Sequence, residues 1–160
     1  MTGSAGTAPS PTSGTTPAGV TTASDTGTVD ACAGGPEGRV RLGVVDRGVF
    51  TPWEEGADAP MGEDAGGVFG LPFGLEVSGL DQTDQLSALV DLYVEDEIFQ
   101  SAFGSLITDC TDGVGTGIRF IPFDEGVDAD DLTGKSARLE VTLADKVDGK
   151  ASTELSVILR

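Results

Sequence analysis

The sequence contains no histidine, and it contains only two cysteines and one tryptophan. Without histidine, neither a Ser-His-Asp triad nor a Cys-His pair can be built, and the usual His/Cys zinc sites are excluded within one chain. Basic residues are also few: 9 Lys and Arg stand against 27 Asp and Glu, which gives a formal net charge of −18. A negative charge of this size repels phosphate backbones and anionic lipids, and it therefore argues against binding to nucleic acids or membrane surfaces.

Long apolar runs and catalytic signatures are absent as well. The chain has no stretch of about 20 apolar residues, so the sequence predicts no direct membrane insertion. It has no GxSxG, HExxH, Walker or Rossmann pattern. The glycine-rich stretch 112–117 has no lysine and precedes a strand pattern, so it is interpreted as a loop. The carboxylates are so numerous that no acid–base pair stands out, and the sequence predicts neither an enzyme nor a resident cofactor.

The first part of the chain differs in composition from the rest. Thr, Ser, Ala, Gly and Pro make up nearly all of residues 1–29, which contain no aromatic residue. Such a segment cannot bury enough apolar surface to offset the entropy lost on ordering its backbone. We therefore expect a disordered, low-complexity tether over residues 1–31, followed by one folded domain over residues 32–160.

The N-terminus lacks the charged segment and apolar core of a signal peptide. In bacterial lipoproteins, a small-residue tether likewise stands between the acylated cysteine and the folded domain. By analogy, we expect the protein to be secreted or displayed at the cell surface. Lipid anchoring through a removed N-terminal segment is a hypothesis.

From Arg39 onward, apolar and polar residues alternate with a period of two, which is typical of strands with one buried face. The clearest case is 137–143, followed by a turn at 145–150 and a second alternating segment at 155–159. Weaker alternation occurs at 40–44, 73–77, 88–94, 103–107 and 118–122. About seven strands separated by turn signals predict an antiparallel, Ig-like β-sandwich.

The segment 86–99 fits a helical period loosely, through Leu89, Leu92 and Phe99. Its Val, Tyr and Ile residues favour a strand, and we prefer that interpretation. Leu132, preceded by Asp130 and Asp131, predicts a single helical turn between sheets.

Cys32 lies where the tether meets the domain, and Cys110 lies at the end of a predicted strand. One cysteine pair in an acidic, histidine-free and exported domain predicts a disulfide, with two free thiols as the alternative. A disulfide here would fix the point at which the tether leaves the domain.

Carboxylates gather in three segments: 54–64, 124–131 and the turn at 145–148. Calcium binds such oxygen ligands, and Asp124, Asp128, Asp130 and Asp131 are the candidate set. The spacing does not match an EF-hand, because Leu132 and Thr133 stand where an acidic ligand and glycine are needed. The alternative is solvated acidic loops, which we prefer.

Trp53 follows Pro52 and precedes acidic residues. It is a candidate for binding a sugar or a protein partner, although such a residue more often covers one end of a core.

The layout resembles that of small secreted or lipid-anchored domains of myxobacteria and related bacteria, in which a Thr/Ser/Pro tether precedes a compact β domain. The features that carry this resemblance are the tether 2–29, the Gly66–Gly67 pair, Gly79–Leu80 after a strand, and the hairpin turn 145–149. The last two strands also resemble those of fibronectin- or cadherin-like modules, whose final strand can be an exposed edge that pairs with another chain. The resemblance implies an Ig-like fold at the cell surface and no catalytic residue.

These observations predict a non-catalytic extracellular β-sandwich with a structural or adhesive role. Its expected partners are other surface proteins, glycans or copies of itself. One alternative is a subunit of an extracellular filament assembled by strand pairing or donation. The other is a carbohydrate-binding module or a small carbohydrate-active enzyme that uses Trp53 and neighbouring carboxylates.

Overall fold

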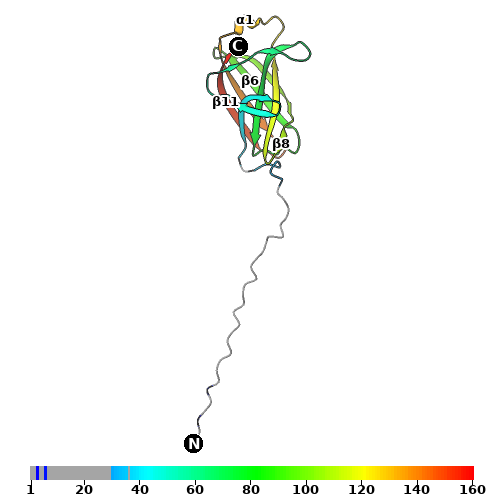
Figure 1. The fold of residues 1–160 in the computed structure, drawn as a ribbon, viewed down its shortest axis with the longest axis vertical. Coiled ribbons are helices and arrows are strands. Elements are labelled where there is room, and N and C mark those ends of the chain that lie inside the picture. The colour runs from blue at the N-terminus through cyan, green and yellow to red at the C-terminus, as the bar shows by residue number, and fades with distance from the viewer. Residues whose placement is uncertain (1–2, 4–5, 7–29, 36) are drawn as a thin grey trace.

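The computed structural model describes residues 3, 6, 30–35 and 37–160. Across residues 37–160 the chain forms two β-sheets packed face to face, with one short helix, so the predicted all-β sandwich is confirmed (Figure 1). Except for residues 3, 6, 30 and 31, the predicted tether lies outside the described residues, and its disorder stays a prediction.

The first sheet has six strands. Five of them follow each other in the order β2 (Val49–Pro52), β1 (Arg39–Asp46), β5 (Phe69–Ser78), β9 (Val114–Pro122) and β8 (Asp109–Thr111). The sixth, β4 (Gly62–Glu63), pairs with the beginning of β5. All these pairings are antiparallel, as the sequence predicted.

The second sheet has five strands, in the order β3 (Ala57–Ala59), β11 (Lys150–Leu159), β10 (Ser136–Ala144), β6 (Leu86–Val94) and β7 (Glu97–Leu106). Its pairings are antiparallel except that of β3 with β11, which is parallel. The final strand was expected to be an exposed edge, and this is wrong for its last residues, because β3 covers Val157–Leu159.

The seven longest strands are those whose alternation the sequence revealed: β1, β5, β6, β7, β9, β10 and β11. The segment at 86–94 is a strand and not a helix, and the helical turn at Leu132 is α1 (Ala129–Leu132). The four short strands were missed because two to four residues are too few to show a period. Two of them, β3 and β4, lie within the acidic segment 54–64 that was interpreted as a long loop.

Three tight turns connect neighbouring strands through pairs of residues with positive φ: Arg47–Gly48, Glu95–Asp96 and Asp112–Gly113. Two-residue hairpins of this kind match the twist of the flanking strands. The glycine-rich stretch 112–117 is therefore a turn followed by the first residues of β9, and its interpretation as a loop was wrong beyond Gly113.

The core lies between the sheets and is built mainly from alternate residues of the long strands. In β6, for example, Leu86, Ala88, Val90 and Leu92 are fully buried, whereas Leu89 is exposed. The largest fully buried side chains are leucines, with Ile121, Val77 and Val90. Burial of this apolar surface is the main stabilising contribution to the fold.

The connection from β7 to β8 takes the chain from one sheet to the other across glycines of β9. A Cβ on Gly117 would lie 2.7 Å from Leu106 Cδ1, and a Cβ on Gly115 would lie 2.9 Å from Thr108 Cβ. The fourth long strand, β7, pairs with β6 in the five-stranded sheet. In constant-type immunoglobulin domains the fourth strand belongs to the opposite sheet.

The sandwich has two poles, which lie at opposite ends of its long axis (Figure 1). One pole holds residues 30–35, β8 and the turn between β10 and β11, and we call it the disulfide pole. The other holds α1 and the C-terminal Arg160. The chain therefore enters the described domain at one end of the sandwich and finishes at the other.

Candidate functional site

Cys32 and Cys110 form a disulfide, as predicted, with their Cα atoms 6.1 Å apart and 78 residues apart in sequence. Cys110 lies in β8, the edge strand beside β9. The bond therefore joins the first part of the described domain to the rim of the six-stranded sheet.

Backbone hydrogen bonds hold the same segment on its other side. The N–H of Gln82 donates to the carbonyl of Cys32 (2.7 Å), and the N–H of Gly35 donates to that of Gly79 (3.0 Å). Ala33 and Asp81 form an isolated antiparallel bridge. Residues 32–35 are thus fixed both to β8 and to the connection between β5 and β6, so the direction in which the chain enters the sandwich is set at this pole.

Asp145 organises the disulfide pole through its carboxylate. Oδ2 accepts from the N–H of Asp81 (2.9 Å), and Oδ1 accepts from the N–H groups of Val147 (2.9 Å) and Gly149 (2.6 Å). Burial by itself raises the pKa of Asp145, but the three backbone donors outweigh it, and the net pKa is lowered. The sequence indicated a turn here but not its attachment to Asp81.

Two neighbouring carboxylates also have lowered pKa values. The hydroxyl and backbone N–H of Thr83 both donate to Asp81 and lower its pKa. The backbone N–H of Gln85 lowers the pKa of Asp84, with a further contribution from Lys146. These three carboxylates are ionised structural acceptors, which is the opposite of what a general acid requires.

Trp53 lies on the side of the sandwich between β1 and β11. The side chain is half-buried and packs against the core. The backbone N–H of Trp53 donates to the carbonyl of Leu42 (2.9 Å). A hollow of about 140 Å³ beside it is lined largely by Val40, Leu42, Pro52 and Leu155. The side chain therefore covers this side of the core, and a binding role for Trp53 stays a prediction.

The acidic segment 124–131 leads into α1 at the opposite pole and includes its first residues. Asp128 is the N-cap of this helix: Oδ1 accepts from the N–H of Asp130 at 3.0 Å. One of the four candidate calcium ligands thus has a structural role in capping. Among the described residues, no group of three or more acidic or cysteine side chains is placed to hold a metal ion. The calcium site stays a prediction.

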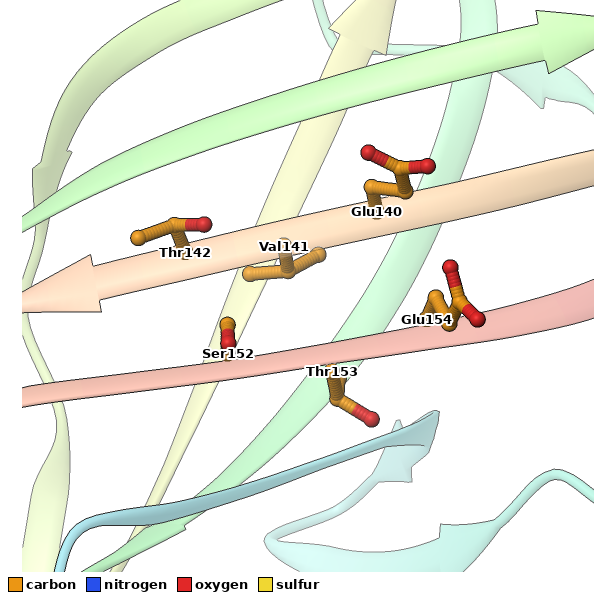
Figure 2. A pocket seen from close by; sticks show the side chains of 6 residues that line it. All are labelled: Glu140, Val141, Thr142, Ser152, Thr153 and Glu154. Carbon is orange, nitrogen blue, oxygen red and sulfur yellow. The ribbon is translucent and has the colours of Figure 1, made fainter.

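An open depression of about 340 Å³ lies on the outer face of the five-stranded sheet, along β10 and β11 (Figure 2). Glu140 and Glu154 are cross-strand partners, and their carboxylates lie on the same side of the sheet, as do Thr142 and Ser152 in the next row. Asp91 of β6 continues the acidic row as the other neighbour of Glu140. Three carboxylates therefore lie side by side across three strands.

Arg138 pairs with two of these three carboxylates. Its guanidinium pairs with Glu140, reaches Glu154 at 3.5 Å, and lies over the ring of Tyr93, 4.3 Å from its centroid. Ser101 donates to Asp91 at the other end of the row. We call Tyr93, Arg138 and the three carboxylates the outer-face cluster. The alternation indicated which of these residues face outward, but not the register that brings them together.

No known protein family matches the chain, and no curated protein sequence matches it. Within the described residues, no helix is long and apolar enough to cross a membrane.

Proposed function

We propose that this chain is a non-catalytic β-sandwich module that acts outside the cytosol, secreted or at the cell surface, in a structural or adhesive role. The observation that carries the proposal is the Cys32–Cys110 disulfide, which fixes the chain's entry at one pole of the sandwich. Disulfides of this structural kind persist in oxidising compartments and are rare in the reducing cytosol.

The placement of the ends supports a role in display. A segment attached at the disulfide pole would hold the sandwich so that α1 and the C-terminal pole point away from the attachment (Figure 1). A force applied to that segment would be transmitted to β8 by the covalent disulfide, in addition to the hydrogen bonds of residues 32–35.

The chemistry of the described surface supports a binding role over a catalytic one. The outer-face depression is open to solvent, and Arg138 pairs with the two glutamates that line it. Catalytic sites instead typically exclude water and hold fixed polar groups that stabilise the charge developing on the substrate in the transition state. Glycan binding has weaker support, because Arg138 covers the ring of Tyr93 and the core holds that of Trp53.

Location is tested on intact cells that produce the chain naturally. The side chains of Lys135 and Lys146 are 38% and 53% exposed, so a membrane-impermeant amine reagent can reach them. We expect labelling without lysis and no alkylatable thiol in the native protein. Labelling only after lysis, together with two free thiols, would contradict the proposal.

The adhesive part is tested with two matched arginine variants. Arg138→Ala disrupts the outer-face cluster, whereas Arg41→Ala removes a comparable arginine from the other sheet, where it pairs with Glu76 and lies over Phe50. We expect adhesion of the protein to the surface of its own cells, and to a printed glycan array as a second probe, to fall only in Arg138→Ala. Equal adhesion by both variants and the original protein would contradict a role for this face.

A further inference from the structure

β7 is the longest strand at the edge of either sheet. It has ten residues, whereas the other edge strands, β2, β3, β4 and β8, have four, three, two and three. Along its outer side, no strand of the described chain pairs with it. A row of backbone N–H and C=O groups on this side is therefore available to another strand.

Between its two ends, the same strand lacks the charged residues and prolines that normally block such pairing. The sequence carries no charged residue and no proline from Ile98 to Thr108, in a chain with a net charge of −18. Ile98, Phe103 and Ile107 are 60%, 76% and 78% exposed. Phe103 lies directly opposite Leu89 of β6, which is also exposed, so that the edge carries an apolar pair on its outer face.

Both ends of the free edge are limited by the structure. At the beginning, the register shifts: Leu92 pairs with Gln100 and Tyr93 with Ile98, which leaves Phe99 as a bulge. At the other end, Arg119 extends from β9 and donates from Nη1 to the carbonyl of Ser105 (2.9 Å). The regular edge available for pairing is therefore the stretch 100–104.

We propose that this edge is a self-association site, at which β7 pairs antiparallel with β7 of a second copy around a two-fold axis. The occupant must be an extended strand, because the free groups are those of a strand backbone. An isologous contact places the same stretch on both sides, so one uncharged edge meets another.

Charge selects this edge for contact between copies. Two chains of net charge −18 repel each other wherever their carboxylates face, and pairing of like charges across strands is destabilising. The short edges β3 and β8 carry Asp58 and Asp109, and β2 ends at Pro52, which cannot donate to a ladder. Pairing at β7 avoids these costs, and it joins the Phe103–Leu89 pairs of both copies on one continuous outer face. The inference does not depend on the compartment in which the chain acts.

The test is sedimentation equilibrium of the full chain over a wide concentration range, for the original protein and two variants. Phe103→Glu places a charge on the edge, and Val49→Glu adds the same charge at a residue of β2 that is 66% exposed. We expect the original protein to dimerise and Phe103→Glu to weaken the dimer by at least about tenfold, because a charged residue on an edge strand opposes pairing. Val49→Glu should change the dimer constant by less than about twofold.

Hydrogen exchange then locates the contact. Amides in residues 100–104 should exchange more slowly at high than at low protein concentration, and this difference should disappear in Phe103→Glu. Higher salt should strengthen the dimer, since it screens the repulsion between copies. A monomer at every concentration, equal weakening by both variants, or concentration-dependent protection elsewhere in the sandwich would each overturn the proposal. Slower exchange in this stretch only after another protein is added would overturn it as well.

A third variant examines the boundary set by Arg119. Arg119→Leu removes the group that occupies the Ser105 carbonyl and so lengthens the free edge. The dimer should become severalfold tighter, provided that circular dichroism shows the variant to be folded. Unchanged or weaker association of the folded variant would contradict pairing along this edge.

Discussion

The carboxylate of Asp145 accepts a hydrogen bond from the backbone N–H of Asp81 across 64 positions of sequence. This contact joins the turn between β10 and β11 to the connection between β5 and β6, which also holds Cys32 through Gln82. The disulfide pole is therefore one connected unit, in which a single carboxylate serves three backbone donors.

Asp145→Asn should lower the free energy of unfolding by about 2 kcal/mol, since hydrogen bonds to a charged acceptor are the stronger kind. An amide has one acceptor oxygen, so its NH₂ group would face either the N–H of Asp81 or those of Val147 and Gly149. Urea unfolding measures the loss. Asp148→Asn, in the same turn, removes the same charge at a position with φ of 69° that asparagine tolerates. It should change stability by less than about 0.5 kcal/mol, and an equal loss in both variants would contradict this role for Asp145.

The contribution of the three carboxylates at the disulfide pole to the free energy of unfolding should decrease in acid. The folded-state pKa values of Asp81, Asp84 and Asp145 are lowered, so below about pH 5 the unfolded chain binds more protons than the folded one. Their contribution is complete above the ordinary carboxyl pKa of about 3.9 and is lost as the pH falls through the lowered values. Acid also relieves the repulsion of a net charge of −18, which acts in the opposite direction.

The comparison of the original protein with Asp145→Asn separates these two effects. The stability difference between them should be constant near neutral pH and should shrink as the pH is lowered toward about 2. Urea unfolding at a series of pH values gives the difference directly. A difference that does not change with pH would show that the charge of Asp145 has no part in the stabilisation.

Removal of the disulfide should cost more than any of these hydrogen bonds. With a sequence separation of 78 residues, the chain-entropy relation gives about 4.5 kcal/mol for the double variant Cys32→Ser, Cys110→Ser. The measurement is urea unfolding of the oxidised protein and the variant. The reduced original protein is the control and should match the variant, since both lack the cross-link. A loss below about 1 kcal/mol would contradict the assignment of this bond as the main constraint on the domain.

Alanine substitutions at two glycines with positive φ allow the cost of backbone strain to be distinguished from the cost of a steric clash. Gly79 has φ of 73°, and a Cβ there would lie 1.9 Å from the carbonyl oxygen of Glu37, whereas Gly56 has φ of 78° with nothing within 4 Å. Gly56→Ala should therefore cost about 1 kcal/mol from strain alone. Gly79→Ala should cost about 3 kcal/mol or more, because the backbone of residues 37–38 must also move. Thermal unfolding ranks the two, and equal losses would contradict the close approach.

Several parts of the fold could be predicted from local pattern alone. The alternation at 137–143 and 155–159 defines which side chains of β10 and β11 face inward, whatever lies opposite them. The turn between these two strands was predicted from its Asp and Gly residues, and Asp148 there has positive φ, which aspartate accepts. The short strand β3 could not be predicted in this way, because its three residues form a strand only through the neighbouring β11.

The candidate sites divide in the same manner. Both cysteines were identified from composition and position, and the structure brings them together. The outer-face cluster could not be identified, because Asp91 and Glu154 are neighbours of Glu140 only through the register of three strands.

The amino-acid sequence alone defines the buried faces of β6, β10 and β11, the turn between β10 and β11 and the pair of thiols, since each depends on residues close together in the chain or on simple counting. The packing of the whole chain was needed to show that β7 is an edge, that Arg119 limits it, and that Asp145 holds Asp81. These relationships join residues far apart in sequence, and their energies depend on which strands become neighbours, a choice that no local periodicity encodes.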